Sequence, residues 1–223
     1  DLLWRGGSPP GDGLPWDGWL RQLAGTADLT VAPSVLAGVP VSGELHLASQ
    51  AAGMRVQATA EAGGNALSLA GLGGLGEGGR SASAAAAADR WQVKAQAPRL
   101  ASLGPLLRLV AEAAPTLATW LPSAGQVNAD ARIEGRWPDL RSAGRLQAQG
   151  WRSPSARVDR ADARWQVGPL AAEEPTGAAA QPTTPLSLDL SAQGLEFAGQ
   201  RIDRVEGKLS GTPRDHQWRL LAD

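Results

Sequence analysis

The segment from Leu186 to Gln193 alternates apolar and polar residues with a period of two, and this alternation constrains the fold more than any other feature of the chain. In an extended strand, successive side chains point to opposite faces, so Leu186, Leu188 and Leu190 are expected on one face and Asp189 on the other. A strand with one apolar face must bury that face against a core or line an apolar channel. That choice decides the function.

Similar alternating segments recur along the chain and are separated by Gly, Pro or Asn. The segments expected as strands are 41–49, 54–60, 66–72, 127–137, 145–150, 161–167, 186–192 and 205–209. In 127–137 the inward set is expected to be Val127, Ala129, Ala131, Ile133, Gly135 and Trp137. Strands this frequent, joined by short turns, favour an antiparallel meander, because parallel crossovers need about a dozen residues each.

A short tryptophan-containing motif recurs along the chain. Residues 89–93 read DRWQV, residues 163–167 read ARWQV, and residues 216–220 form a weaker third copy. The unequal spacing differs from that of a regular solenoid but indicates an elongated sheet built by repetition. Tryptophan suits such strands, because it favours β-structure and carries one polar N–H. We therefore expect most of the tryptophans to be structural.

A helix is expected over residues 100–122, where apolar residues recur at spacings of three and four. Ser102 is a candidate N-cap, and Pro115 should kink or split the helix. Because its polar face has few basic residues, packing over an apolar sheet face is favoured over binding to a membrane surface. A second, shorter helix is expected near Pro15, with an apolar side formed by Trp16, Trp19, Leu20 and Leu23.

Two further segments lack clear periodicity. Residues 173–184 are rich in Pro, Ala and Thr and are expected to form a mobile surface loop. The alanine-rich run 81–88 is expected to be a strand, since it leads directly into the first Trp-Gln-Val repeat.

Composition and charge exclude several classes of function. The net charge of -1 provides no basic field for nucleic acid, which is therefore not expected as a partner. There is no cysteine, which excludes disulfides, thiolate metal sites and cysteine nucleophiles. No stretch of about 18 uncharged apolar residues occurs. The chain is expected to be a piece of a longer protein, with any membrane anchor outside it.

No motif carries enzymatic chemistry. Residues 71–76 match G-x-G-x-x-G, but further glycines follow where a dinucleotide site needs a helix, so a glycine-rich hairpin connection is expected instead. His46 and His216 lie in separate strand-like segments without a second ligand at metal spacing. The acidic residues are dispersed, and no serine lies in a nucleophile elbow. We expect neither an enzyme nor a cofactor.

Four motifs, in their order along the chain, resemble those of a known protein family. They are PVSGEL at 40–45, LPSAG at 121–125, GRWPDLRSAGRL at 135–146, and GTPRDH at 211–216 followed by Trp218 and Leu220. This order resembles the TamB family, the inner-membrane subunits of translocation and assembly modules. TamB proteins belong to the AsmA-like proteins, which resemble bridge-like lipid transfer proteins. The resemblance covers most of the chain.

The resemblance implies an elongated, curled antiparallel sheet, a "β-taco" groove, with one or two amphipathic helices packed on or in it. It implies the periplasmic part of a protein of Gram-negative bacteria that is anchored in the inner membrane outside this segment. It further implies a role in outer-membrane biogenesis, with phospholipid acyl chains as cargo and an Omp85-type outer-membrane barrel, TamA-like, as partner of other regions. The expected organisation is a groove segment over 1–99, a helical insertion over 100–122, and a second groove segment over 123–223 with a mobile loop at 171–185.

Nine residues are the candidate lining of a lipid groove: Leu45, Leu47, Val127, Ile133, Trp165, Val167, Leu186, Leu188 and Leu190. The alternative for each is an ordinary core, in which these side chains contact one another and the helix. Two other functions stay open at this point. One is a scaffold whose sheet edges template the strands of a client barrel protein by β-augmentation. The other is a closed β domain that binds a ligand.

Overall fold

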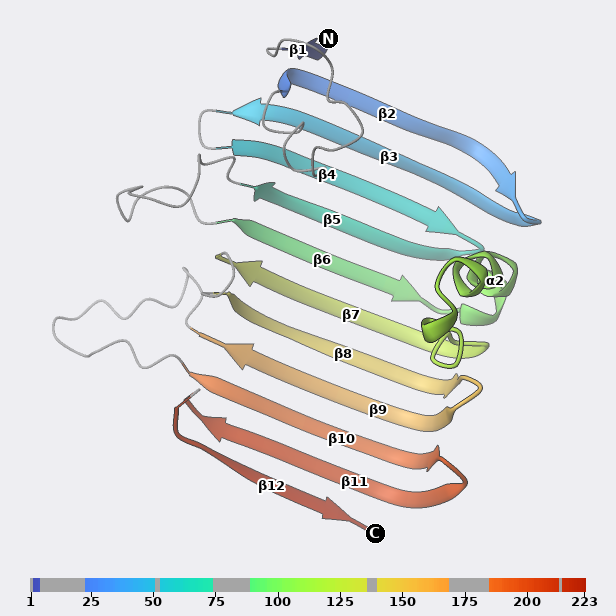
Figure 1. The fold of residues 1–223 in the computed structure, drawn as a ribbon, viewed down its shortest axis with the longest axis vertical. Coiled ribbons are helices and arrows are strands. Elements are labelled where there is room, and N and C mark those ends of the chain that lie inside the picture. Colours follow the sequence, from blue (N-terminus) through green and yellow to red (C-terminus); the bar gives the residue numbers. More distant parts are fainter. Residues whose placement is uncertain are drawn as a thin grey trace, which may run out of the picture.

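A computed structural model describes residues 2–4, 23–50, 53–73, 89–135, 140–168, 185–212 and 214–223. Its strands form one antiparallel sheet of 12 strands whose spatial order is the chain order (Figure 1). The strands are β1 (Leu2–Trp4), β2 (Leu23–Leu36), β3 (Val39–Gln50), β4 (Gly53–Ala62), β5 (Asn65–Gly73), β6 (Arg90–Ala97), β7 (Ala124–Glu134), β8 (Arg141–Arg152), β9 (Ala156–Val167), β10 (Leu186–Phe197), β11 (Gln200–Gly211) and β12 (His216–Ala222). The expected mainly β antiparallel meander is confirmed.

Tight turns join several neighbouring strands. In the β2–β3 turn, Ala37 and Gly38 both have positive φ, and Gly63 and Gly64 do so in the β4–β5 turn. Two successive residues with positive φ make the turn whose twist matches that of the flanking strands. Such turns allow each strand to pair with the next one in the chain.

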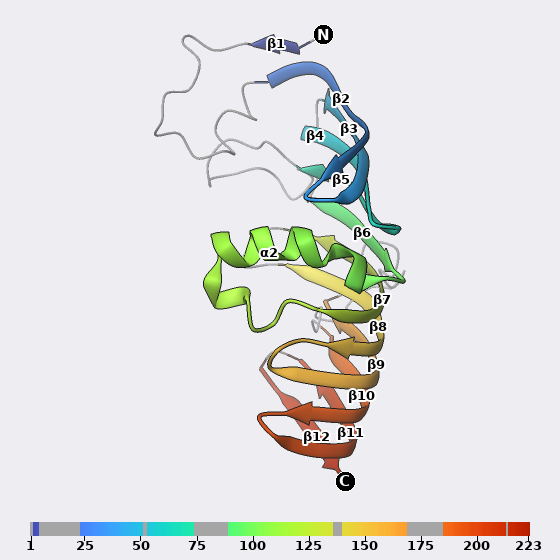
Figure 2. The same cartoon turned by 90° about the vertical axis from the view of Figure 1, so that its right-hand side faces the viewer.

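The sheet curls along its length. Seen along the strands, it bends so that one face is concave, and the helical insertion stands on that concave side (Figure 2). The sheet is also open: among the described strands, β12 pairs only with β11 and no pair joins it to β1 or β2. The expected curled sheet with an associated helix is therefore present.

The helical insertion is shorter and more broken than its periodicity predicts. It consists of a 3-10 turn at Leu100–Leu103, helix α2 (Gly104–Ala113) and a second 3-10 turn at Pro115–Leu117. The break at Pro115 is confirmed. The predicted N-cap is wrong: Ser102 lies inside the first 3-10 turn, and its hydroxyl donates to the carbonyl of Gly63 at 2.6 Å. No residue of α2 is buried, so the helix does not pack closely on the sheet.

A buried asparagine fixes the start of this insertion to the sheet. Asn65, at the beginning of β5, is only 6% exposed. Its amide donates to the carbonyl of Arg99 at 3.1 Å and contacts the hydroxyl of Ser102 at 3.1 Å. Its carbonyl accepts the backbone N–H of Arg99 at 3.0 Å. These contacts join residues 34 and 37 positions apart.

Several strand boundaries differ from the expected ones. Every expected strand lies in an observed one except at 127–137, where β7 ends at Glu134 and residues 136–139 lie outside the described part. The structure adds four strands that are not among the expected segments, β1, β2, β6 and β12, of which β6 and β12 contain copies of the Trp repeat. Leu23 begins β2 instead of ending a helix. The remaining residues of the expected second helix, the run 81–88 and the loop 173–184 all lie outside the described residues.

We predict that Asn65→Ala lowers the free energy of unfolding by about 1–3 kcal/mol, because it removes a buried amide and takes away the acceptor of the part-buried backbone N–H of Arg99. Urea unfolding followed by tryptophan fluorescence measures the change. The control is Asn128→Ala, at an exposed position on β7, which should stay within about 0.5 kcal/mol of the parent chain. Equal effects of both substitutions would contradict an anchoring role for Asn65.

Candidate functional site

Cross-strand pairing aligns the apolar residues of successive strands into continuous rows on one face. Leu188 on β10 lies opposite Trp165 on β9 and Leu209 on β11. Following such pairs from β2 to β12 defines the central row: Leu29, Leu45, Ala58, Leu69, Val93, Ala131, Gly144, Trp165, Leu188, Leu209 and Trp218. A parallel row, the second row, contains Leu67, Ala95, Ala129, Leu146, Leu190 and Leu220. No charged residue occurs in either row.

All nine residues predicted from the sequence lie on this apolar face. Leu45, Trp165 and Leu188 belong to the central row, and Leu190 belongs to the second row. A third row runs along the other side of the central row, away from the second row. It contains Leu47, Ile133, Val167 and Leu186. Val127 pairs with Ala148 in a row of mostly small residues beyond the second row. The register therefore brings together side chains from β3, β7, β9 and β10. Their contact with lipid stays a prediction.

The apolar face is only partly shielded from solvent. All nine of these residues are half-buried, and none of them is buried. Among the described residues, no large side chain falls below 2% exposed. A closed core would bury such leucines almost completely, as usually happens to leucine in globular proteins. The nine residues are thus less buried than the leucines of a closed core, whereas Leu209 of the central row is buried at 8% exposed.

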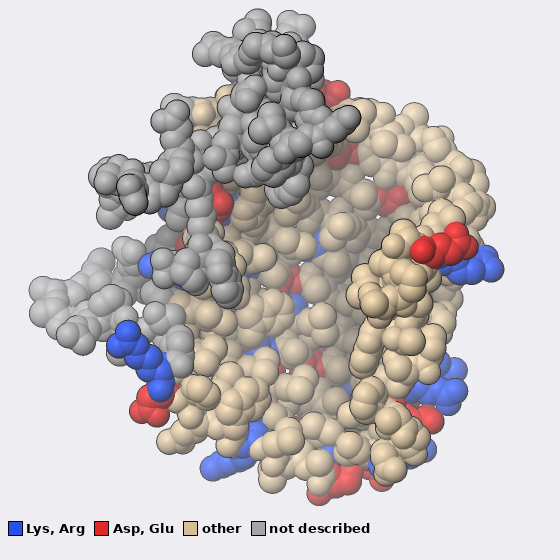
Figure 3. All heavy atoms as spheres, in the orientation of Figure 1, with Lys and Arg blue, Asp and Glu red and all other residues tan. Residues whose placement is uncertain are grey.

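The apolar face coincides with the hollow of the molecule. In the view that faces the concave side, the hollow is lined mainly by uncharged residues, with small charged areas visible between them, and the most prominent charged side chains lie at the rim (Figure 3). Helix α2 stands at one rim of this hollow (Figures 1 and 3). A sheet with a wet convex face and an apolar concave face is a trough whose inner surface cannot bind water well.

Glycines make room for the tryptophans on this face. A Cβ added at Gly144 would lie 2.4 Å from the Trp165 ring, and one at Gly71 would lie 2.3 Å from the Trp91 ring. Each ring therefore lies flat over a glycine of the neighbouring strand. This explains both the repeated Trp-Gln-Val motif and the first glycine of the G-x-G-x-x-G match. The expected structural role fits these two tryptophans.

The apolar rows reach both ends of the sheet without a covering element in the described residues. At one end Leu29 and Val31 of β2 are 60% and 45% exposed. At the other end Trp218 and Leu220 of β12 are 61% and 67% exposed. None of these four positions is among the nine residues predicted to line the groove. Alternation at 27–31 (ADLTV) and the weak third Trp repeat were the available signals.

The opposite face is polar and carries cross-strand ion pairs. Lys94 lies 3.9 Å from Asp130, and Lys208 lies 3.7 Å from Asp189. On the same face, His46 Nδ1 lies 2.5 Å from Asp28 Oδ1. All these groups are exposed, so such pairs contribute little to stability. Their main consequence is a convex face that stays hydrated.

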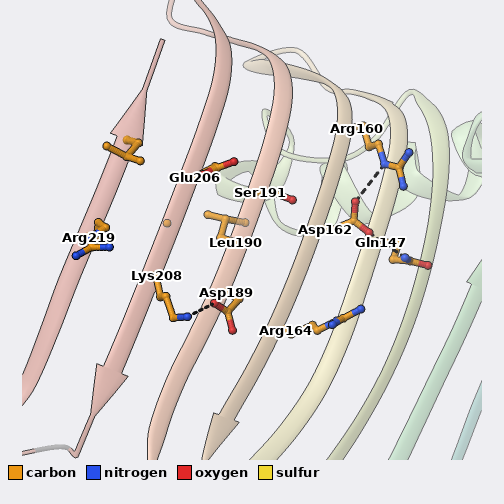
Figure 4. A pocket seen from close by; sticks show the side chains of 12 residues that line it. Gln147, Arg160, Asp162, Arg164, Asp189, Leu190, Ser191, Glu206, Lys208 and Arg219 are labelled. Atoms are coloured by element: carbon orange, nitrogen blue, oxygen red, sulfur yellow. Dashed lines mark hydrogen bonds and ion pairs between the residues drawn. The ribbon is translucent and has the colours of Figure 1, made fainter.

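One shallow hollow of about 660 Å³ occurs on this polar face between β8 and β12 (Figure 4). Its lining mixes both charge signs, including the Lys208–Asp189 pair. Hydrogen bonds from Gln147 and Arg160 lower the pKa of Asp162, which keeps this carboxylate ionised. Four cationic and three anionic side chains alternate around the hollow, and this mixture points to no particular ligand.

Two kinds of site are not found in the described part of the chain. No group of His, Asp or Glu side chains there could hold a metal ion. No helix in these described ranges is long and apolar enough to cross a membrane. Comparison of the chain with protein-family models, with curated proteins and with solved structures gives no match.

We predict that Gly144→Ala destabilises the sheet by about 1–3 kcal/mol, because the added methyl group overlaps the Trp165 ring and the Asp130 carbonyl. Urea unfolding followed by tryptophan fluorescence reports this change. The control is Gly104→Ala in α2, where an added Cβ meets nothing within 4 Å. This control should be neutral or slightly stabilising. If both substitutions behave alike, the tryptophan does not need the glycine beneath it.

Proposed function

We propose that this chain is a section of a lipid conduit that carries phospholipid acyl chains along the concave face of its sheet. The observation that supports this proposal is the set of apolar rows that continue from β2 to β12 on a half-exposed concave face. The family resemblance of the sequence adds the cellular setting. In that setting the chain is a periplasmic part of an AsmA-like, TamB-type protein that acts in outer-membrane biogenesis.

The free energy of transfer explains why such a face suits acyl chains. Each CH₂ group exposed to water costs about 0.8 kcal/mol, so a chain of about sixteen carbons faces a cost of about 12 kcal/mol. A continuous apolar trough removes most of that cost. Because aliphatic contacts change little from strand to strand, an acyl chain can move along the rows while its headgroup stays in water. No catalytic residue is needed.

The dimensions also fit this role. Neighbouring strands lie about 4.8 Å apart, so the rows from β2 to β12 extend for about 50 Å. An acyl chain is shorter than this length, and the rows can hold more than one chain in sequence. The proposed anchor in the inner membrane and the Omp85-type partner would belong to other parts of the protein.

Photocrosslinking in cells tests the conduit directly. A photoreactive amino acid is placed at Leu188 or at Asp189 of the full-length protein, and attached phospholipid is detected by mass spectrometry. We expect lipid at Leu188, which faces the trough, and none at its neighbour Asp189, which faces the convex side. Lipid at neither position, with normal protein abundance, would reject the conduit.

A second candidate function is strand addition to the edge of the sheet during assembly of outer-membrane proteins. The observation in its favour is β12, whose residues from His216 to Ala222 are all exposed. Asp223 and Arg204 exchange backbone hydrogen bonds at 3.0 and 3.3 Å. Since inward and outward N–H groups alternate along an antiparallel edge strand, the N–H of Leu220 points away from β11. An unpaired edge of this kind can accept another strand.

We predict that Leu220→Pro blocks strand addition and leaves the sheet folded, because proline removes an N–H that β11 does not use. Leu220→Ala is the matched control, since it removes the side chain and keeps the N–H. Assembly of outer-membrane proteins and lipid crosslinking at Leu188 are measured for both variants. If only the proline variant loses assembly while lipid crosslinking persists, the edge has its own function. Equal assembly in both variants argues against strand addition.

A further inference from the structure

Helix α2 forms a wall at one rim of the trough. Figure 2 shows it on the concave side of the sheet, and Figure 1 shows it at the rim where β6 ends and β7 begins. None of its ten residues is buried. If α2 were packed tightly against the strands, its contact residues would be buried, as Leu100 is at the start of the insertion. The helix therefore leaves the trough beside it accessible.

The wall has one apolar side and one charged side. At about 100° per residue, Leu103, Leu106 and Val110 lie on one side of the helix axis. Arg108 and Glu112, the charged residues of α2, lie on the opposite side. In Figure 3 the charged side chains near this rim lie on its outer side, and the side towards the hollow is uncharged. The apolar side of α2 therefore continues the apolar surface of the sheet.

Both ends of the wall are tied to turns of the sheet. At the first end, Ser102 and Arg99 bind Asn65 and the Gly63 carbonyl. At the other end, the Thr119 carbonyl accepts the hydroxyl of Ser155 at 2.5 Å, and Trp120 stacks on Phe197 with 6.0 Å between ring centroids. Attachment at two separate turns holds α2 in one place, so the wall exists before any ligand arrives.

We propose that α2 is a second wall of the lipid site, where an acyl chain in the trough contacts Leu106 and Val110. This inference rests on the proposed conduit and identifies one acyl chain as the occupant. The apolar side of α2 is aliphatic and uncharged, and it lies beside the rows of the sheet. The wall keeps an acyl chain on the sheet at this rim, midway along the trough.

The test compares two neighbouring positions that are both exposed. A photoreactive amino acid replaces Val110, which is 43% exposed, or Glu112 on the opposite side of the same helix. The full-length protein is used in cells, adducts are analysed for phospholipid by mass spectrometry, and Leu188 is the reference position. We expect severalfold more phospholipid at Val110 than at Glu112. Protein abundance and the urea midpoint show that each variant is folded.

The other outcomes separate this inference from the proposed function. Phospholipid at Leu188 but not at Val110 overturns the wall and leaves the conduit standing. Equal labelling at Val110 and Glu112 also overturns it, since it indicates lipid around the whole helix. A protein adduct at Val110 identifies a protein partner and rejects the acyl chain. No phospholipid at either Leu188 or Val110 rejects the conduit and the wall together.

Discussion

The structure depends on the register that keeps apolar residues opposite one another in every strand pair. A slip of one residue in any pair would move the apolar set of that strand to the other face. The rows would then end at that strand, and the concave face would contain polar side chains. The tight turns with two positive φ values and the tryptophans seated over Gly71 and Gly144 hold the register. Backbone hydrogen bonding, turn conformation and ring packing thus all keep the strands in the same register.

A sheet of this kind has an unusual energetic balance. Only one face is apolar, and no second layer covers it along most of its length in the described residues. Its stability therefore relies on long cross-strand hydrogen-bond ladders and on side-chain contacts within each row. The uncovered apolar area is unfavourable in water, and an apolar ligand in the trough would remove that cost. The proposed function and the stability of the sheet would therefore depend on the same surface.

The two faces of the sheet have different surface properties. The convex face carries exposed ion pairs such as Lys94–Asp130, which keep it hydrated and discourage association through that side. The concave face and the inner side of α2 provide aliphatic contact without charge. Strand β1 pairs only with the first three residues of β2, so the trough continues along the rest of β2 at one end of the described sheet and along β12 at the other. This arrangement suits a cargo that slides, because nothing in the trough binds one point of the cargo strongly.

The sequence by itself determined which residues share a face and where the helix breaks. Alternation in β10 and the position of Pro115 are local properties, fixed by the pleat of a strand and by the missing N–H of proline. The strand β2 escaped prediction because a glycine and a proline interrupt its short alternation. Only the tertiary structure decided that the apolar face is concave and half-exposed, and that α2 stands beside it. Those features depend on contacts between distant residues, such as Asn65 with Arg99, which no local pattern encodes.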